Sequence, residues 1–111
     1  MGKVTPISTG KAAEPAADPE TQARTLAAEG NQKLLGQDLD GALQLFQRAL
    51  ALKPEGPVLA GLYRSMGIAL TRQGNIEEGA HYYRLYLPLC TNPKESALLK
   101  TTLEEYDARR R

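Results

Sequence analysis

The sequence repeats itself once at a fixed spacing, and this repeat restricts the fold more than any other feature. A shift of 37 residues, the distance from Gly30 to Gly67, brings two segments into register. The positions that match in character are Gly30 with Gly67, Leu39 with Ile76, Ala42 with Gly79, Phe46 with Tyr83, and Leu50 with Leu87. A spacing of this size is typical of supersecondary units stacked one on the next.

Each copy has the pattern of two helices joined by a short turn. In the second segment of the first copy, apolar residues recur at helical spacing on one face. Proline and glycine in "PEGP" and glycine in "GQD" and "QGN" interrupt the helical pattern. Five helices are predicted, over about 19–35, 39–53, 57–72, 76–87 and 92–108. Because all segments are helical and the turns are short, we expect an all-α fold with antiparallel neighbours.

Local signals support the helix ends. Asp18 before Pro19 is a favourable start, because aspartate caps and proline suits the first helical position. Asn75 with Glu78, and "NPKE" at 92–95, have the spacing of a capping pair. Pro88 should end or kink the fourth helix near Leu87.

The composition indicates a folded protein with no general attraction for polyanions. Hydrophobic residues make up 41% of the chain and the net charge is +1. We therefore expect no nucleic-acid or membrane partner. No apolar run approaches the ~20 residues of a membrane helix, and the first residues lack the apolar core of a secretory signal. With Cys90 as the only cysteine, a cytoplasmic location is expected.

These segments resemble tetratricopeptide repeats, whose helix–turn–helix unit has about 34 residues and the pattern W-x2-L-G-x2-Y, A-x3-F and P. The second copy has Tyr63-x2-Met66-Gly67-x2-Leu70, then Gly74, Ile76 and Gly79-x3-Tyr83. The first has Leu26, Gly30, Leu39, Ala42-x3-Phe46-x2-Ala49 and Pro54. The resemblance implies a short right-handed solenoid with repeats at 19–54 and 57–91 and a capping helix at 92–108. Residues 1–18 form an Ala/Pro-rich tail and 109–111 a basic end.

The resemblance also explains why helical segments contain glycines. Gly30 and Ala42 in the first copy, and Gly67 and Gly79 in the second, should lie where paired helices cross. Gly74 belongs to a turn, where only glycine adopts a left-handed conformation at low cost. Tyr86 replaces a small residue, so either its helix splays or its ring points toward the fifth helix.

Residues that could carry out catalysis are few, and we expect a non-enzymatic protein without cofactor or metal. His81 is the only histidine, and its helix should direct it to solvent. Cys90 is expected to be a small buried hydrophobe rather than a reactive thiol. The acidic pairs at 77–78 and 104–105 diverge by roughly 100° on a helix, so they do not form an acid/base dyad.

In the family, the first helix of each unit lines a concave groove that holds a segment of another protein. The positions carried over by the resemblance are Arg24, Asn31, Leu34, Arg64, Ile68, Thr71, Arg72 and, on the fifth helix, Lys100 and Glu104. Arginine pairs well with carboxylates, so the expected partner is a protein segment with Asp, Glu or a terminal carboxylate beside an apolar anchor. The alternative is that these arginines are ordinary solvated charges. The carboxylate clamp of chaperone-binding members is mostly absent, because Ala27 and Ser65 replace two of its residues.

Three functions remain open. The first is an adaptor that binds a partner's segment in the groove. The second is a structural or oligomerisation module, such as a homodimer or part of a larger assembly. The third is a regulatory subunit whose tail, residues 1–18, carries the binding motif.

Overall fold

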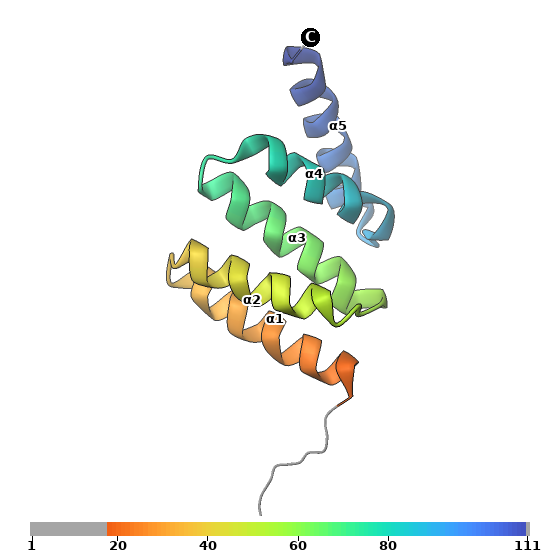
Figure 1. Cartoon of the computed structure of the whole chain (residues 1–111). Coiled ribbons are helices and arrows are strands. Elements are labelled where there is room, and N and C mark those ends of the chain that lie inside the picture. The colour runs from red at the N-terminus through yellow and green to blue at the C-terminus, as the bar shows by residue number, and fades with distance from the viewer. Residues whose placement is uncertain (1–17, 111) are drawn as a thin grey trace, which may run out of the picture.

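Helices make up nearly all of residues 18–110, which are the residues that the computed structural model describes. Five α-helices and one short 3₁₀ helix follow one another (Figure 1). They are α1 (Pro19–Leu35), α2 (Leu39–Ala51), α3 (Gly56–Arg72), α4 (Ile76–Tyr86), the 3₁₀ helix η2 (Leu87–Leu89) and α5 (Pro93–Arg109). The predicted all-α fold with five helices is confirmed, and each predicted helix end lies within two residues of the observed one. The predicted tail, apart from Asp18, and Arg111 lie outside the described residues.

Side chains cap three of the helices at their N-termini. Asp18 Oδ1 accepts a hydrogen bond from the Thr21 amide at 2.7 Å, and this bond lowers the pKa of the Asp18 carboxyl. Asp38 Oδ1 accepts from the Gly41 amide at 3.0 Å. These bonds satisfy amides that have no partner inside the helix, and so they fix where α1 and α2 begin.

The two predicted capping pairs differ from the expected form. Asn92 Oδ1 accepts from the amides of Lys94 and Glu95 at 3.0 and 3.1 Å. The Glu95 side chain accepts from Arg64 and Tyr86. Asn75 makes no side-chain bond to the first turn of α4. Its Nδ2 instead donates to Glu78 Oε1 at 3.0 Å, so the prediction of a backbone cap at Asn75 was wrong.

The helices pair as α1 with α2 and α3 with α4, and α3 packs on both helices of the first pair (Figure 1). A Cβ atom at Gly30 would lie 2.5 Å from Phe46 Cε1, and one at Gly67 would lie 2.9 Å from the Tyr83 ring. A Cβ atom at Gly79 would lie 2.5 Å from Thr71 Oγ1. The glycines therefore lie where paired helices cross, as predicted. Gly74 is in the turn after α3 with φ +88°, also as predicted.

The hydrophobic core lies between α1, α2 and α3. Phe46, Leu62 and Met66 are its largest fully buried side chains. In contrast, α5 has one buried residue, Leu103, and within residues 18–110 its backbone lies close to α4 and η2. None of the helices in residues 18–110 is long and apolar enough to cross a membrane.

Tyr86 shows how the chain accommodates a large residue at a position where the first copy has Ala49. The ring is buried and its hydroxyl donates to Glu95 Oε1 on α5 at 2.9 Å. The second of the two predicted arrangements is therefore confirmed, because the ring points toward the fifth helix.

Candidate functional site

Three of the predicted site residues surround one hollow between α1 and α3. Arg24 and Asn31 come from α1, and Arg64 comes from α3. The hollow has a volume of about 430 Å³. Its other lining residues are small or apolar, apart from a serine: Ala27, Ala28, Pro57, Val58, Gly61 and Ser65. Two guanidinium groups and an amide thus face a surface that is otherwise mostly apolar.

A partly buried hydrogen bond orients the amide of this site. Ser65, which is only 9% exposed, donates from Oγ to Asn31 Oδ1 at 2.9 Å. Because the amide oxygen is engaged, Asn31 presents its Nδ2 group as a donor. In the sequence, Ser65 was noted only because it replaces an asparagine of the carboxylate clamp. Its bond to Asn31 depends on the packing of α1 on α3, which the sequence does not reveal.

Arg64 has a partner that the sequence did not reveal. Its Nε donates to Glu95 Oε2 on α5 at 2.6 Å, while the Tyr86 hydroxyl donates to the other oxygen of the same carboxylate. The Arg64 hydrogen bond, with that of Tyr86, lowers the pKa of the Glu95 carboxyl. The same bond raises the pKa of the Arg64 guanidinium, and burial raises the pKa of the Tyr86 hydroxyl. Glu95 lies 31 residues from Arg64, so no local pattern could have indicated the pair.

A second hollow, of about 410 Å³, adjoins the first at Arg64. It lies between the start of α3 and the η2 segment, and it shares Pro57, Gly61 and Arg64 with the first. Its other lining residues are Gly56, Ala60, Tyr86, Leu89, Cys90 and Thr91. Together the two hollows, which we call the α1/α3 trough, extend from Arg24 to Cys90 with Arg64 in the middle.

The remaining predicted site residues lie outside this trough. Leu34 is buried in the core, so its predicted position on the groove surface is corrected: it packs inside. Ile68 is partly buried and packs against the same core. Thr71, Arg72, Lys100 and Glu104 are exposed, and none of them lines the trough.

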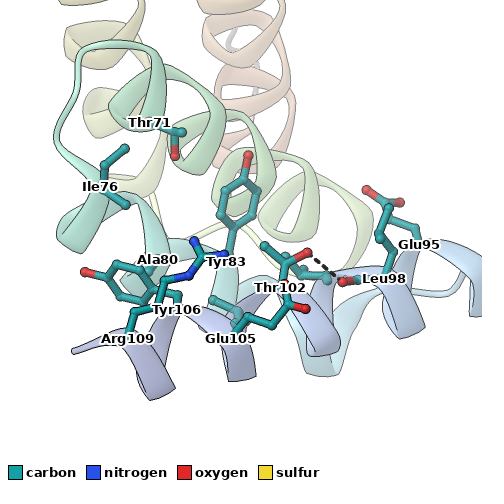
Figure 2. A pocket seen from close by; sticks show the side chains of 12 residues that line it. Thr71, Ile76, Ala80, Tyr83, Glu95, Leu98, Thr102, Glu105, Tyr106 and Arg109 are labelled. Carbon is teal, nitrogen blue, oxygen red and sulfur yellow. Dashed lines mark hydrogen bonds between the residues drawn. The ribbon is translucent and has the colours of Figure 1, made fainter. Parts of the chain in front are cut away.

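A third hollow, between α4 and α5, was not predicted (Figure 2). It measures about 490 Å³, and its apolar lining includes Ile76, Ala80 and Leu98, with Thr71 and Arg109 also at its wall. Leu98 is 70% exposed and Ile76 is 44% exposed, so two large apolar side chains lie open to solvent at this hollow. The sequence could not predict it, since it depends on the angle at which α5 rests on α4.

Groups that could perform chemistry are dispersed. His81 is exposed, as predicted, and its ring contacts the Tyr82 ring edge-on at a centroid distance of 5.2 Å. Cys90 is half-buried rather than fully buried, and its Sγ lies 3.5 Å from Asn92 O and 3.8 Å from Glu95 Oε1. No group of three His, Cys, Asp or Glu residues within 18–110 is placed to hold a metal ion.

Compared with protein-family models, with curated proteins and with solved structures, the chain gave no significant match.

Proposed function

We propose that the chain is a non-enzymatic adaptor that binds a carboxylate-bearing segment of a partner protein in the α1/α3 trough. The observation that carries this proposal is the convergence of Arg24, Asn31 and Arg64 on one hollow. The resemblance of the two copies to tetratricopeptide repeats supports it, because that family holds protein segments on the face formed by the first helix of each unit.

The chemistry of the trough favours an acidic segment with an apolar anchor. Arg24 is exposed, and its side chain makes no hydrogen bond or ion pair within the described residues, although the Asp18 carboxylate attracts it electrostatically. A planar guanidinium with free donors pairs with a carboxylate through two parallel hydrogen bonds. Between the arginines, Ala27, Pro57 and Val58 offer apolar surface for a neighbouring side chain. Such a combination of a few polar groups with apolar surface is typical of peptide-binding grooves.

Selection from a random peptide library displayed on phage tests the proposal. Peptides enriched on the wild-type chain should contain Asp, Glu or a terminal carboxylate, and the Arg24→Gln/Arg64→Gln variant should not retain them. The Arg48→Gln/Arg72→Gln variant is the matched control, because it removes two exposed arginines outside the trough. Enriched peptides without acidic groups, or equal retention by both double variants, would refute the acidic-segment proposal.

A second candidate, a self-associating module, is favoured by the hollow between α4 and α5. Leu98 and Ile76 place apolar surface at its mouth, and apolar patches of this kind occur at protein–protein contacts. This candidate predicts a dimer of the wild-type chain in solution that the Leu98→Asp variant converts to a monomer. Native mass spectrometry or light scattering measures this, and a monomeric wild type over the micromolar range would exclude it.

A further inference from the structure

The chain already contains a complete carboxylate-binding site, and one of its own side chains occupies it. Arg64 on α3 and Tyr86 on α4 each donate to one oxygen of Glu95, at 2.6 and 2.9 Å. Cys90, after η2, lies 3.8 Å from the oxygen that Tyr86 contacts. All of these groups belong to α3, α4 and the segment that follows, whereas the carboxylate alone comes from α5. We call the Arg64 guanidinium and the Tyr86 hydroxyl the carboxylate site.

The helix that supplies this carboxylate is weakly attached. Within residues 18–110, the three ion pairs that join different helices are Arg64–Glu95, Arg84–Asp107 and Glu77–Arg110, and each includes α5 or the residue after it. All three are substantially exposed, and exposed ion pairs contribute little net stability. The Tyr106 ring adds contacts to the guanidinium groups of Arg84 and Arg110, and Leu103 is the only buried residue of α5. Elements with so little buried surface open first.

The carboxylate site also faces the α1/α3 trough. Arg64 lines both hollows of the trough, and Tyr86 lines the second. A carboxylate brought along the trough by a partner approaches these two donors from the trough side, whereas Glu95 lines the hollow between α4 and α5. Arg64 Nε and the Tyr86 hydroxyl each have one proton to donate, so a partner's carboxylate and Glu95 cannot both accept these two bonds.

We infer that Glu95 is an internal ligand that keeps the carboxylate site closed, and that a carboxylate of the partner segment displaces it and releases the start of α5. This inference rests on the proposed function for the identity of the displacing group. It adds that binding in the trough is coupled to the position of α5, at the opposite end of the molecule from α1 (Figure 1).

Competition with an internal group sets a requirement on the partner. A group tethered by a short segment acts at an effective concentration on the order of millimolar. A single carboxylate in free solution at micromolar concentration does not displace it. The partner must gain affinity from further contacts, and Arg24, Asn31 and the apolar surface of the trough are the groups available. The ligand class is therefore a segment with at least two acidic groups flanking an apolar residue.

Removing the Glu95 charge tests the inference in the full-length chain. The probe is a fluorescein-labelled peptide that alternates leucine with aspartate and ends in a free carboxylate. Its affinity is measured by fluorescence anisotropy, and the opening of α5 by hydrogen exchange of residues 93–109. Glu95→Gln should bind the peptide about fivefold more tightly than wild type, because the internal competitor is lost. It should also exchange faster across α5 without peptide, and adding peptide to wild type should produce the same increase.

Glu104→Gln is the matched control, since Glu104 is an exposed glutamate of α5 whose side chain has no partner within the described residues. Equal α5 exchange in Glu95→Gln, Glu104→Gln and wild type overturns the internal-ligand role, whatever the peptide does. Peptide binding that is lost in Arg64→Gln but unchanged in Glu95→Gln overturns the displacement and leaves the adaptor function standing. Peptide binding by none of the variants overturns the adaptor function and the displacement together.

Discussion

An aromatic ring lies on a glycine at each of the two equivalent helix crossings. Phe46 covers Gly30, and Tyr83 covers Gly67. The absence of a side chain lets the two helices of each pair approach closely, and the packing gained offsets the helix propensity that glycine loses. Glycine is therefore required at these two positions for steric reasons, because a larger residue would not fit at the crossing.

Gly67→Leu should lower the free energy of unfolding by ~1–3 kcal/mol, because even a Cβ atom there would lie 2.9 Å from the Tyr83 ring. Gly61→Ala on the same helix is the control. A Cβ atom at Gly61 meets nothing within 4 Å, so the change should stabilise the helix by ~0.5–1 kcal/mol. Urea unfolding followed by circular dichroism measures both. If Gly67→Leu unfolds at the same urea concentration as wild type, the crossing is not tightly packed.

At the scale of the helices, the two asparagines that directly precede α4 and α5 make different hydrogen bonds. Asn92 caps two backbone amides of α5, whereas Asn75 donates to the Glu78 side chain and caps none in α4. The sequence motif is the same at both sites, and the difference lies in the direction of each side chain.

Asn92→Ala should therefore destabilise α5 by ~1 kcal/mol, the usual value of a lost cap. Asn75→Ala should change the stability of α4 by only a few tenths of a kcal/mol, the usual size for an exposed position. The local opening free energies from hydrogen exchange of the two helices separate these effects. Equal losses at the two sites would show that the side-chain directions do not matter.

The attachment of α5 should depend on pH. The pKa of Glu95 is lowered in the folded chain, chiefly by the Arg64 hydrogen bond and then by that of Tyr86. A lowered carboxyl pKa contributes stability that is present above the unfolded value of about 4.3 and is lost as pH falls through the folded value. The pKa values of Arg64 and Tyr86 are both raised, so Arg64 stays charged and Tyr86 stays neutral throughout that range. Exchange of α5 amides, corrected for intrinsic rates, should rise below about pH 4, and Glu95→Gln should reduce this dependence.

The sequence could predict features that depend on neighbouring residues, but not features that depend on how distant helices pack. Helix positions followed from proline, glycine and Asx residues at segment ends, because those effects act within a few residues. The crossing glycines and the convergence of Arg24, Asn31 and Arg64 followed from the repeat and the family resemblance. Leu34 was misplaced because a helix face adjoining the core contains both buried and surface positions. The Arg64–Glu95 pair and the hollow at Leu98 depend on how α5 sits, and no local signal fixes that angle.

On the scale of the whole molecule, stability is concentrated at one end. The largest buried side chains belong to α2 and α3, while α5 relies on exposed ion pairs and Leu103. Hydrogen exchange at increasing denaturant should show α5 opening well before α2 and α3, as a separate unit. Raising the salt concentration should widen that difference, because salt screens exposed pairs more than it affects buried packing. A single transition for all helices would show that α5 unfolds with the core.

The open surface beside α5 also makes the fold extendable. Ile76 and Leu98 leave exposed apolar surface at the hollow between α4 and α5. Solenoid repeat proteins are built of stacked units, and a terminal repeat with a polar outer face keeps them soluble. A designed helix pair joined after Arg109, with leucines facing Ile76 and Leu98, therefore has a template on which to nucleate. This end of the molecule is therefore a starting surface for designing longer helical scaffolds.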